Sequence, residues 1–260
     1  MYNIKQKFKT LIKELLSNKN LEIRNKFEIP KSLTNDEQFI LKQIISNELS
    51  MSRPENVLNT IMASNYVCRN KIKGDFVECG IWRGGNSIAA KAIFNIYNEK
   101  KELYLYDTFA GMTEPSKFDF RLKDSKRAVD TFNKTKLMDK NNWCYASLDD
   151  VKENIKKYTG DLKNIKFIKG DILKTLKIKK YIPKKISILR LDTDWYDSTK
   201  LEMEILYPLL EKNGVLIIDD YNYWAGSKKA IDEYFHDNPL FKKPLLIPTD
   251  DGGGVCGIKI

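Results

Sequence analysis

Two apolar segments joined by a helical pattern constrain the fold of this chain more than any other feature. Residues 186–191 and residues 215–218 each have the continuous apolar character of a buried strand. The residues between them, 198–212, have a helical pattern that Asn213 and Gly214 close. Strand, helix and strand in this order form a βαβ unit, whose right-handed crossover places both strand ends at one edge of a parallel sheet. The chain is therefore predicted to be an α/β protein.

Acidic residues follow both of these strands. Asp192 ends the first strand, and Asp219 and Asp220 end the second. Their carboxylates are expected to converge where open α/β sheets bind ligands. Because carboxylates at one place repel each other unless a cation or a proton joins them, the pattern favours a hard divalent ion such as Mg²⁺. The alternative is that these aspartates cap a helix or a turn, which single acidic residues at strand ends often do.

Composition limits the class of protein further. The 260 residues are 42% hydrophobic and 31% charged, which suits one α/β domain with an extension. No apolar run approaches the roughly 18 residues of a membrane span, and the N-terminus lacks the apolar core of a signal peptide. Four scattered cysteines without a Cys-x-x-Cys pair are typical of reduced thiols, so a cytoplasmic location is expected.

The formal net charge of +10 is compatible with nucleic acid, a membrane surface or an anionic substrate as partner. The lysines are spread along the chain, which favours a bias of composition first and a phosphate-bearing small molecule second; no nucleic-acid partner is expected. The sequence contains one histidine, His236, late in a helical pattern. A general base is therefore expected to be a carboxylate, a lysine or a tyrosine.

The first part of the chain is predicted to be helical. Residues 1–31 place apolar side chains at helical spacing among lysines, as expected for a helix that packs on the main domain or on a second subunit. We expect residues 1–70 to form an N-terminal helical extension, residues 71–260 to form the main domain, and the N-terminal helices to support a homo-oligomer.

A glycine-containing loop between a short strand at 74–80 and a helix that begins near residue 87 has the layout of a cofactor site. It lacks the Gly-x-Gly-x-x-Gly and Gly-Lys-Ser/Thr patterns of nucleotide loops. An acidic residue inside the strand suits a ligand that carries an amino group. The candidate cofactor-binding residues of this segment are Glu78, Cys79, Gly80, Arg83, Gly84, Gly85, Asn86 and Ser87.

The second strand, 103–106, ends in Asp107 and is followed by Thr108. An acidic residue about 25 positions beyond the glycine loop is well placed to accept hydrogen bonds from ribose hydroxyls. Residues 112–146 are polar and irregular, and a segment of this length is typically a lid or an insertion with its own helix. We expect it to contribute to an acceptor pocket; the alternative is a solvated surface excursion.

The remaining strands complete the predicted sheet. Ser147 begins a helix as its N-cap and is a further candidate at the cofactor site. Asp171 follows a third strand at 165–169, where contact with a base and capping of a short turn are both open. Residues 244–248 and 255–260 predict a closing hairpin. Together these segments predict a mostly parallel seven-stranded sheet with one reversed strand.

Several motifs stand in an order that identifies a family. They are Val-Glu-Cys-Gly-Ile-Trp-Arg-Gly-Gly at 77–85, Tyr-Asp-Thr-Phe-Ala-Gly-Met at 106–112, Ser-Leu-Asp-Asp-Val at 147–151, Leu-Arg-Leu-Asp-Thr-Asp-Trp-Tyr-Asp-Ser-Thr at 189–199, Tyr-Pro at 207–208 and Ile-Asp-Asp-Tyr at 218–221. Over residues 50–260 the chain resembles the macrocin O-methyltransferase family of sugar O-methyltransferases. The chain departs from the common pattern at Thr108, where serine is usual, and at Trp195, where leucine is usual. The second departure is expected to reshape the acceptor pocket.

The resemblance implies a Rossmann-like class I methyltransferase fold, S-adenosylmethionine (SAM) and Mg²⁺. It assigns SAM binding to residues 78–85 and the ribose contact to Asp107. The implied metal ligands are Asp192, Asp219 and Asp220, and the implied general base is Asp194. In such a site a metal stabilises the developing alkoxide of a sugar hydroxyl, and a carboxylate within hydrogen-bond reach takes its proton.

The expected acceptor is a nucleotide-linked sugar used for a capsule or another surface glycan. Methylation of a natural-product glycoside is the first alternative. A glycosyltransferase is the second, because residues 192–194 also form an Asp-x-Asp motif that would hold a metal and a sugar nucleotide. A non-catalytic basic binding module is a weaker alternative, since acidic residues are interleaved near the expected cleft.

Overall fold

The computed structural model describes residues 27–138, 140–250 and 252–260. The chain divides into two units, residues 1–32 and residues 33–260. All the helices and strands described below belong to the second unit. The helix and the oligomer contact expected within residues 1–31 fall almost entirely outside the described residues.

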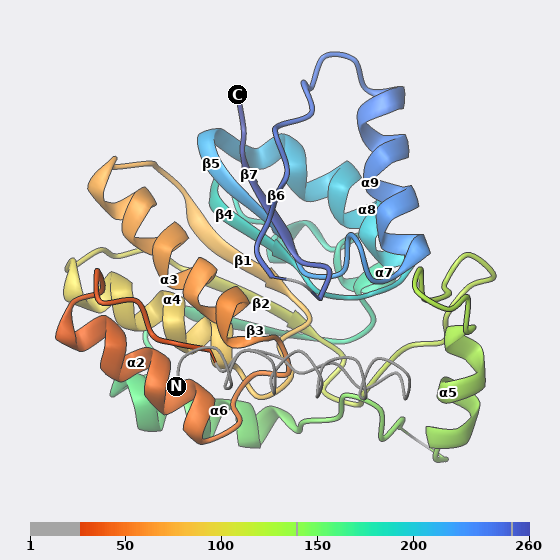
Figure 1. The fold of residues 1–260 in the computed structure, drawn as a ribbon, viewed down its shortest axis with the longest axis horizontal. Coiled ribbons are helices and arrows are strands. Elements are labelled where there is room, and N and C mark those ends of the chain that lie inside the picture. The colour runs from red at the N-terminus through yellow and green to blue at the C-terminus, as the bar shows by residue number, and fades with distance from the viewer. Residues whose placement is uncertain (1–26, 139, 251) are drawn as a thin grey trace, which may run out of the picture. The chain divides into compact units, whose positions relative to one another are not determined.

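A twisted sheet forms the centre of the second unit (Figure 1). Its strand order is β3-β2-β1-β4-β5-β7-β6; the first five are parallel, and β7 runs antiparallel to both of its neighbours. The predicted seven-stranded, mostly parallel sheet with a C-terminal hairpin is confirmed. The strands are β1 Asp75–Cys79, β2 Leu103–Asp107, β3 Ile165–Lys169, β4 Ile186–Leu191, β5 Leu210–Ile218, β6 Ile247–Pro248 and β7 Val255–Ile258.

Helices cover both faces of the sheet. One face carries α2 (Asn35–Ser46), α3 (Pro54–Arg69), α4 (Gly85–Ile96) and α6 (Leu148–Thr159). The other face carries α7 (Ile172–Thr175), α8 (Tyr196–Leu206) and α9 (Ala225–Asp237), seen in cyan to blue in Figure 1. Short 3₁₀ turns at Lys179–Tyr181 and Tyr207–Leu209 and the helix α5 (Ala128–Thr135) complete the described elements.

The central strand β4 shows how the sequence places its side chains. All six of its residues are buried, as the continuous apolar run predicts for a parallel strand covered on both faces. Leu189 and Leu191 pack with Met203 and Leu206 of α8 in one hydrophobic core. Because side chains alternate along a strand, Arg190 points to the opposite face, towards α3 and α4.

The connection from α8 to β5 differs from the prediction of one helix over residues 198–212. The helix ends at Leu206, and β5 begins at Leu210 rather than at residue 215. Pro208 lacks a backbone N–H and cannot continue the helical hydrogen bonds, so a 3₁₀ turn takes its place. Leu210 already pairs with Ile186 of β4, with an irregularity before the regular register resumes.

The extension predicted for residues 1–70 is not a separate body in the structure. The division lies after Ser32, and α2 and α3 belong to the same compact unit as the sheet. Helix α3 packs on α4 and on the strands β4 and β5. Leu41, Ile44 and Ile61 of these two helices are buried, because α2 packs on α3 and α4, and α3 packs on α4 and the sheet.

Two buried tyrosines, Tyr207 and Tyr106, allow the contribution of a buried hydroxyl group to stability to be tested. Tyr207 is fully buried against the rings of Tyr234, Phe235 and Phe241, and its hydroxyl has no hydrogen-bond partner among the described residues. Removing an unpartnered buried hydroxyl relieves a desolvation cost, so Tyr207→Phe should leave the free energy of unfolding unchanged or raise it by up to about 1 kcal/mol. Urea denaturation measures the change.

The matched control is Tyr106→Phe. The Tyr106 hydroxyl donates a hydrogen bond to the backbone carbonyl of Tyr181, so this variant should lose about 1 kcal/mol. A loss of comparable size in Tyr207→Phe would show that its hydroxyl has a partner and would contradict the prediction.

Candidate active site

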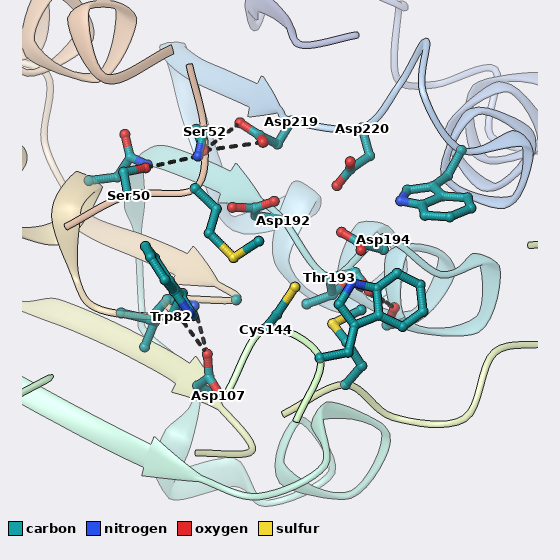
Figure 2. Close-up of a pocket in the computed structure, with 18 of the residues that line it drawn as sticks. Ser50, Ser52, Trp82, Asp107, Cys144, Asp192, Thr193, Asp194, Asp219 and Asp220 are labelled. Atoms are coloured by element: carbon teal, nitrogen blue, oxygen red, sulfur yellow. Dashed lines mark hydrogen bonds between the residues drawn. The ribbon is translucent and has the colours of Figure 1, made fainter. Parts of the chain in front are cut away.

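A cavity of about 390 Å³ lies at the carboxyl ends of β1, β2, β4 and β5 (Figure 2). Parallel strands end at the same edge of a sheet, so residues that follow different strands meet there. The residues expected from the sequence that line this cavity are Gly80, Asn86, Asp107, Thr108, Asp192, Asp194, Asp219 and Asp220. Its volume lies within the range of small-molecule sites.

The loop after β1 is held by Asp107. Figure 2 shows the backbone of Trp82 turned towards the Asp107 carboxylate, which accepts hydrogen bonds from Ile81 N (2.8 Å) and Trp82 N (3.2 Å). Phe109 N donates to the other oxygen of the same carboxylate (2.7 Å). Burial raises the pKa of Asp107, although these backbone donors oppose the shift. Asp107 therefore fixes the shape of the loop and still lines the cavity.

Gly80 permits the close approach of this loop to β4. Its φ of +84° lies in the left-handed region, and a Cβ atom built there would stand 1.9 Å from the backbone oxygen of Asp192. A side chain at this position would push the glycine loop away from the acidic residues that follow β4. Gly80 thus brings the two predicted halves of the site together.

The other expected cofactor residues lie behind the cavity wall. Glu78 and Ser87 are buried, and the Ser87 hydroxyl donates to the Glu78 carboxylate. Cys79 is also buried, and its backbone oxygen accepts from Asp192 N (2.8 Å). Glu78 therefore does not face the cavity, where an amino group of a ligand was expected to meet it.

Gly84, Gly85 and Arg83 shape the start of α4. Gly84 is its N-cap at φ +89°, and Gly85 N donates to the backbone oxygen of Leu49 (2.8 Å), an approach that a Cβ atom would block. Arg83 contacts the Asp150 carboxylate (3.4 Å). These residues place the loop without lining the cavity.

Two further candidates serve as helix caps. The Ser147 hydroxyl accepts from Asp150 N (3.1 Å) at the start of α6. The Asp171 carboxylate accepts from Leu173 N (2.9 Å) at the start of α7. Of the two alternatives left open for Asp171, the structure shows the capping contact.

Three carboxylates form a close cluster in the cavity. Asp192, Asp194 and Asp220 each offer an oxygen, and these atoms all lie within 4.8 Å of one another. In Figure 2 all three point into the same space. Burial first, and the neighbouring carboxylates in addition, raise the pKa of Asp194 to about 7 and that of Asp220 well above its ordinary value. The three carboxylates therefore repel one another unless a cation or protons neutralise them.

Asp219 lies beside this cluster and has other partners. Its carboxylate accepts from Arg190 Nη2 (2.7 Å), from the Ser52 hydroxyl (3.2 and 3.3 Å) and from Asn56 Nδ2 (3.2 Å). The set expected from the sequence was Asp192, Asp219 and Asp220. The structure brings Asp192 and Asp220 together with Asp194, and a ligand role for Asp219 stays a prediction.

The donor set of this cluster fits Mg²⁺. It consists of carboxylate oxygens, which hard divalent ions prefer. The Oδ2 atom of Asp220 is buried and has no hydrogen-bond partner among the described residues. Such an atom is costly to bury unless a ligand completes it. Asp192 and Asp220 could hold the ion, with either Asp194 of the cluster or the neighbouring Asp219 as a third carboxylate.

Arg190 also belongs to this region, although the apolar pattern of β4 did not indicate it. Its side chain is fully buried, and its guanidinium contacts Glu78, Asp192, Asp219 and Ser52. Burial opposes its charge, but the surrounding carboxylates outweigh burial and raise the pKa of Arg190. One feature of the sequence could have indicated this contact: each of two apolar strands contains one charged residue, Glu78 in β1 and Arg190 in β4. The register of the sheet places these two residues directly opposite each other.

Glu202 of α8 is a second buried acid near the cluster. It is fully buried; Thr193 Oγ1 donates to its Oε1 (2.8 Å), and its Oε2 has no partner among the described residues. Burial raises the pKa of Glu202 to about 8, with the Thr193 hydrogen bond opposing and the charges of Asp192 and Asp194 adding to the shift.

An aromatic wall closes the side of the cavity near Asp194; Trp143 and Trp224 line the cavity, and Trp195 packs behind them. Trp143, Trp195 and Trp224 contact one another edge to face, with ring centroids 5.2 to 6.1 Å apart. The indole N–H of Trp195 donates to the backbone oxygen of Thr113 (2.9 Å). Residues 112–138 and 140–146 thus pack against α8 and α9, and Met112, Thr113, Trp143 and Cys144 of this segment line the cavity.

Two segments that sequence reasoning did not assign to the site also line the cavity. One is the start of α3, with Ser50, Met51, Ser52, Arg53 and Asn56; the other is the turn between β6 and β7, with Asp250 and Gly252. Asn56 Nδ2 donates to both Asp219 and Asp250, which joins the two segments.

Comparison with known proteins places this geometry in a class and then in a family. The solved structure titled "Structure of the O-methyltransferase NovP" matches with a TM-score of 0.72 at 22% identity, over 86% of this chain and 97% of that chain. "Crystal Structure of CalS11, Calicheamicin Methyltransferase" matches with a TM-score of 0.59 at 14% identity, over 91% of this chain and 99% of that chain. The fold is that of the class I O-methyltransferases.

Residues 9–250 match the family described as Macrocin-O-methyltransferase (TylF). The chain belongs to this family, and the family predicted from its motifs is confirmed. No helix within residues 27–138, 140–250 and 252–260 has the length and apolar character needed to cross a membrane.

Curated relatives share part of their length with this chain. A demethyldecarbamoylnovobiocin O-methyltransferase of Streptomyces niveus is 29% identical over 190 residues, which are 72% of this chain and 66% of that protein. A tetracenomycin derivative 4'-O-methyltransferase of Streptomyces olivaceus is 31% identical over 169 residues, 65% of this chain and 60% of that protein. The chain therefore spans slightly less than two thirds of these relatives.

The buried acids predict how stability depends on pH. Burial is the first cause that raises the pKa of Glu78 and Asp194 to about 7 and that of Asp219 and Glu202 to about 8. In the unfolded chain these carboxyl groups lose their protons at about pH 4 to 5, the ordinary range of their pKa values. The native state keeps those protons to higher pH. This stabilisation is complete below that range and is lost as the pH rises through 7 to 8.

We expect the melting temperature in chelator to fall between pH 6 and pH 8.5. One proton corresponds to about 1.4 kcal/mol per pH unit, or roughly 3–6 °C in a domain of this size. Differential scanning fluorimetry measures the slope, and Asp220→Asn, which removes one acid of the cluster, should flatten it. A melting temperature that rises over this interval would contradict the assignment of raised pKa values.

Proposed function

We propose that the protein is a SAM- and Mg²⁺-dependent O-methyltransferase that acts on a sugar hydroxyl. The observation that carries this proposal is the acidic cluster of Asp192, Asp194 and Asp220 in the same cavity as the Asp107-bound glycine loop. A methyl donor on the loop and an acceptor beside the acids would share one space. The rival glycosyltransferase would also use the Asp192 and Asp194 carboxylates, but it is disfavoured by the fold and the family.

Two kinds of acceptor suit this proposal. The name of the Streptomyces olivaceus relative contains a rhamnosyl-substituted tetracenomycin, which favours a natural-product glycoside as acceptor. The presence of Arg53 in the cavity wall, where it pairs with Asp250 (3.6 Å), would suit a sugar that is still linked to a nucleotide, of the kind used for surface glycans. Mass spectrometry of nucleotide sugars and glycosides incubated with the protein, SAM and Mg²⁺ separates the two.

When bound, SAM supplies the methyl group, and Mg²⁺ stabilises negative charge that develops on the acceptor oxygen. The chain's own residues then have three tasks. Asp194 takes the proton of the acceptor hydroxyl, since its carboxylate lies in the cluster and histidine is absent from the cavity wall. Asp107 keeps the loop in place. The tryptophan wall excludes water and orients the apolar face of a sugar.

SAM binding should depend on Asp107 and not on Asp171. Asp107→Ala removes the acceptor of the Ile81 and Trp82 N–H groups and a group proposed to bind ribose, so calorimetry should show at least about tenfold weaker SAM binding, since one lost charged hydrogen bond costs roughly 1.5–3 kcal/mol. The matched control is Asp171→Ala, which removes an aspartate that caps α7 outside the cavity wall. Equal SAM affinity in wild type and Asp107→Ala would reject the placement.

Turnover should depend on Asp194 through its charge. With an acceptor found by the mass-spectrometric screen, Asp194→Asn should lower kcat by about 10²- to 10⁴-fold, the range of general acid–base catalysis. SAM affinity should stay near that of wild type. If the Mg²⁺ affinity collapses together with kcat, Asp194 is a metal ligand instead of the base. If kcat is retained, the proton leaves by another route and the assignment fails.

A further inference from the structure

The guanidinium of Arg190 is the central contact of four separate segments. Its Nη1 atom donates to Glu78 Oε1 in β1 (3.1 Å) and to Asp192 Oδ2 after β4 (2.6 Å). Its Nη2 atom donates to the Ser52 hydroxyl before α3 (2.8 Å) and to Asp219 Oδ1 after β5 (2.7 Å). Two strand ends, a neighbouring strand and the loop that precedes α3 are thus fixed by one side chain.

The position of Arg190 in the wall explains which partners it orients. Its side chain is 0% exposed, and neither Arg190 nor Glu78 lines the cavity, whereas Asp192 and Asp219 do. Glu78 is held in turn by the Ser87 hydroxyl of α4. Arg190 is therefore anchored from behind by Glu78 and directs its remaining donors to the two aspartates at the front. Arg190 presents no surface to the cavity, so a substrate bound there would not contact it.

The geometry of these contacts requires arginine. A guanidinium is a planar fork whose donors point in fixed directions, so its Nη1 and Nη2 atoms reach four acceptors at once. A lysine ammonium carries the same charge at one point and cannot meet acceptors on both sides of the fork. Asp192 and Asp219 would then lose a fixed orientation, although the local net charge would not change.

From this arrangement we infer that Arg190 is a positioning residue that presets Asp192 and Asp219 for a divalent cation. The inference rests on the proposed metal site, whose carboxylates Asp192 and Asp219 are held by the hydrogen bonds of Arg190. The positive charge of Arg190 by itself disfavours a nearby cation. Its contribution to cation binding is therefore the orientation of the carboxylates, and outer-shell groups of this kind typically change metal affinity by about 10- to 100-fold.

Arg190→Lys tests the inference because it keeps the charge and changes the fork. Titration with Mn²⁺, followed by electron paramagnetic resonance, should show about 10- to 100-fold weaker binding than in wild type. Calorimetry on the same protein should show nearly unchanged SAM affinity, which a general loss of structure would not allow. The matched control is Arg69→Lys. Arg69 is exposed, and its Nε donates to the Tyr97 hydroxyl, away from the cavity; the Mn²⁺ affinity of this variant should equal that of wild type.

The outcomes separate the inference from the proposed function. If wild type binds no Mn²⁺ and no Mg²⁺, the metal site fails, and the role of Arg190 towards it fails as well. If wild type binds Mn²⁺ and folded Arg190→Lys binds it equally well, the positioning role is wrong while the metal site stands.

A second variant covers the case in which Arg190→Lys does not fold. Ser52→Ala removes one acceptor of the guanidinium and one donor to Asp219 without altering any charge. It should weaken Mn²⁺ binding severalfold, whereas Ser64→Ala, which removes a buried hydroxyl of α3 away from the cavity, should not. Unchanged Mn²⁺ affinity in Ser52→Ala would overturn the inference.

Discussion

Repulsion between carboxylates at the edge of the sheet is the constraint around which the site is organised. The five acids that gather there are Glu78, Asp192, Asp194, Asp219 and Asp220, and one buried guanidinium lies among them. One positive charge cannot balance five negative ones. Burial first, and the neighbouring charges in addition, raise the pKa of Glu78, Asp194, Asp219 and Asp220, and a divalent cation would offset the remaining negative charge. Breaking such a buried set by removing Arg190 would be costly, because it would leave charges without partners.

The rest of the fold holds these groups at their distances. Gly80 allows the loop after β1 to approach Asp192, and Asp107 fixes that loop by its backbone N–H groups. The start of α3 brings Ser52 and Asn56 to Asp219 from the opposite side. The acids and the proposed methyl-donor loop therefore form one rigid edge, and a site of this kind requires such preorganisation to be effective.

The segment over residues 112–138 and 140–146 supplies the part of the cavity that the sheet cannot. It adds Trp143 to the tryptophans at 195 and 224, and it is tied to α8 where Asp119 Oδ1 accepts from Tyr196 N (2.8 Å). An apolar aromatic wall facing a charged cluster suits a sugar, which has both a C–H face and hydroxyl groups. Variation of this segment would change the cavity wall without altering the strands of the sheet.

The sequence by itself determined the parallel sheet, its C-terminal hairpin and the edge at which Asp107, Asp192 and Asp220 meet, because apolar runs and the acidic residues that end them are local properties. It did not determine the end of α8 or the start of β5, where Pro208 and pairing with β4 prevailed over a helical pattern. Only the tertiary structure decided that Arg190 joins Glu78, Asp192 and Asp219. The physical reason is that these partners come from different strands, so their contact depends on register, which no single segment of sequence specifies.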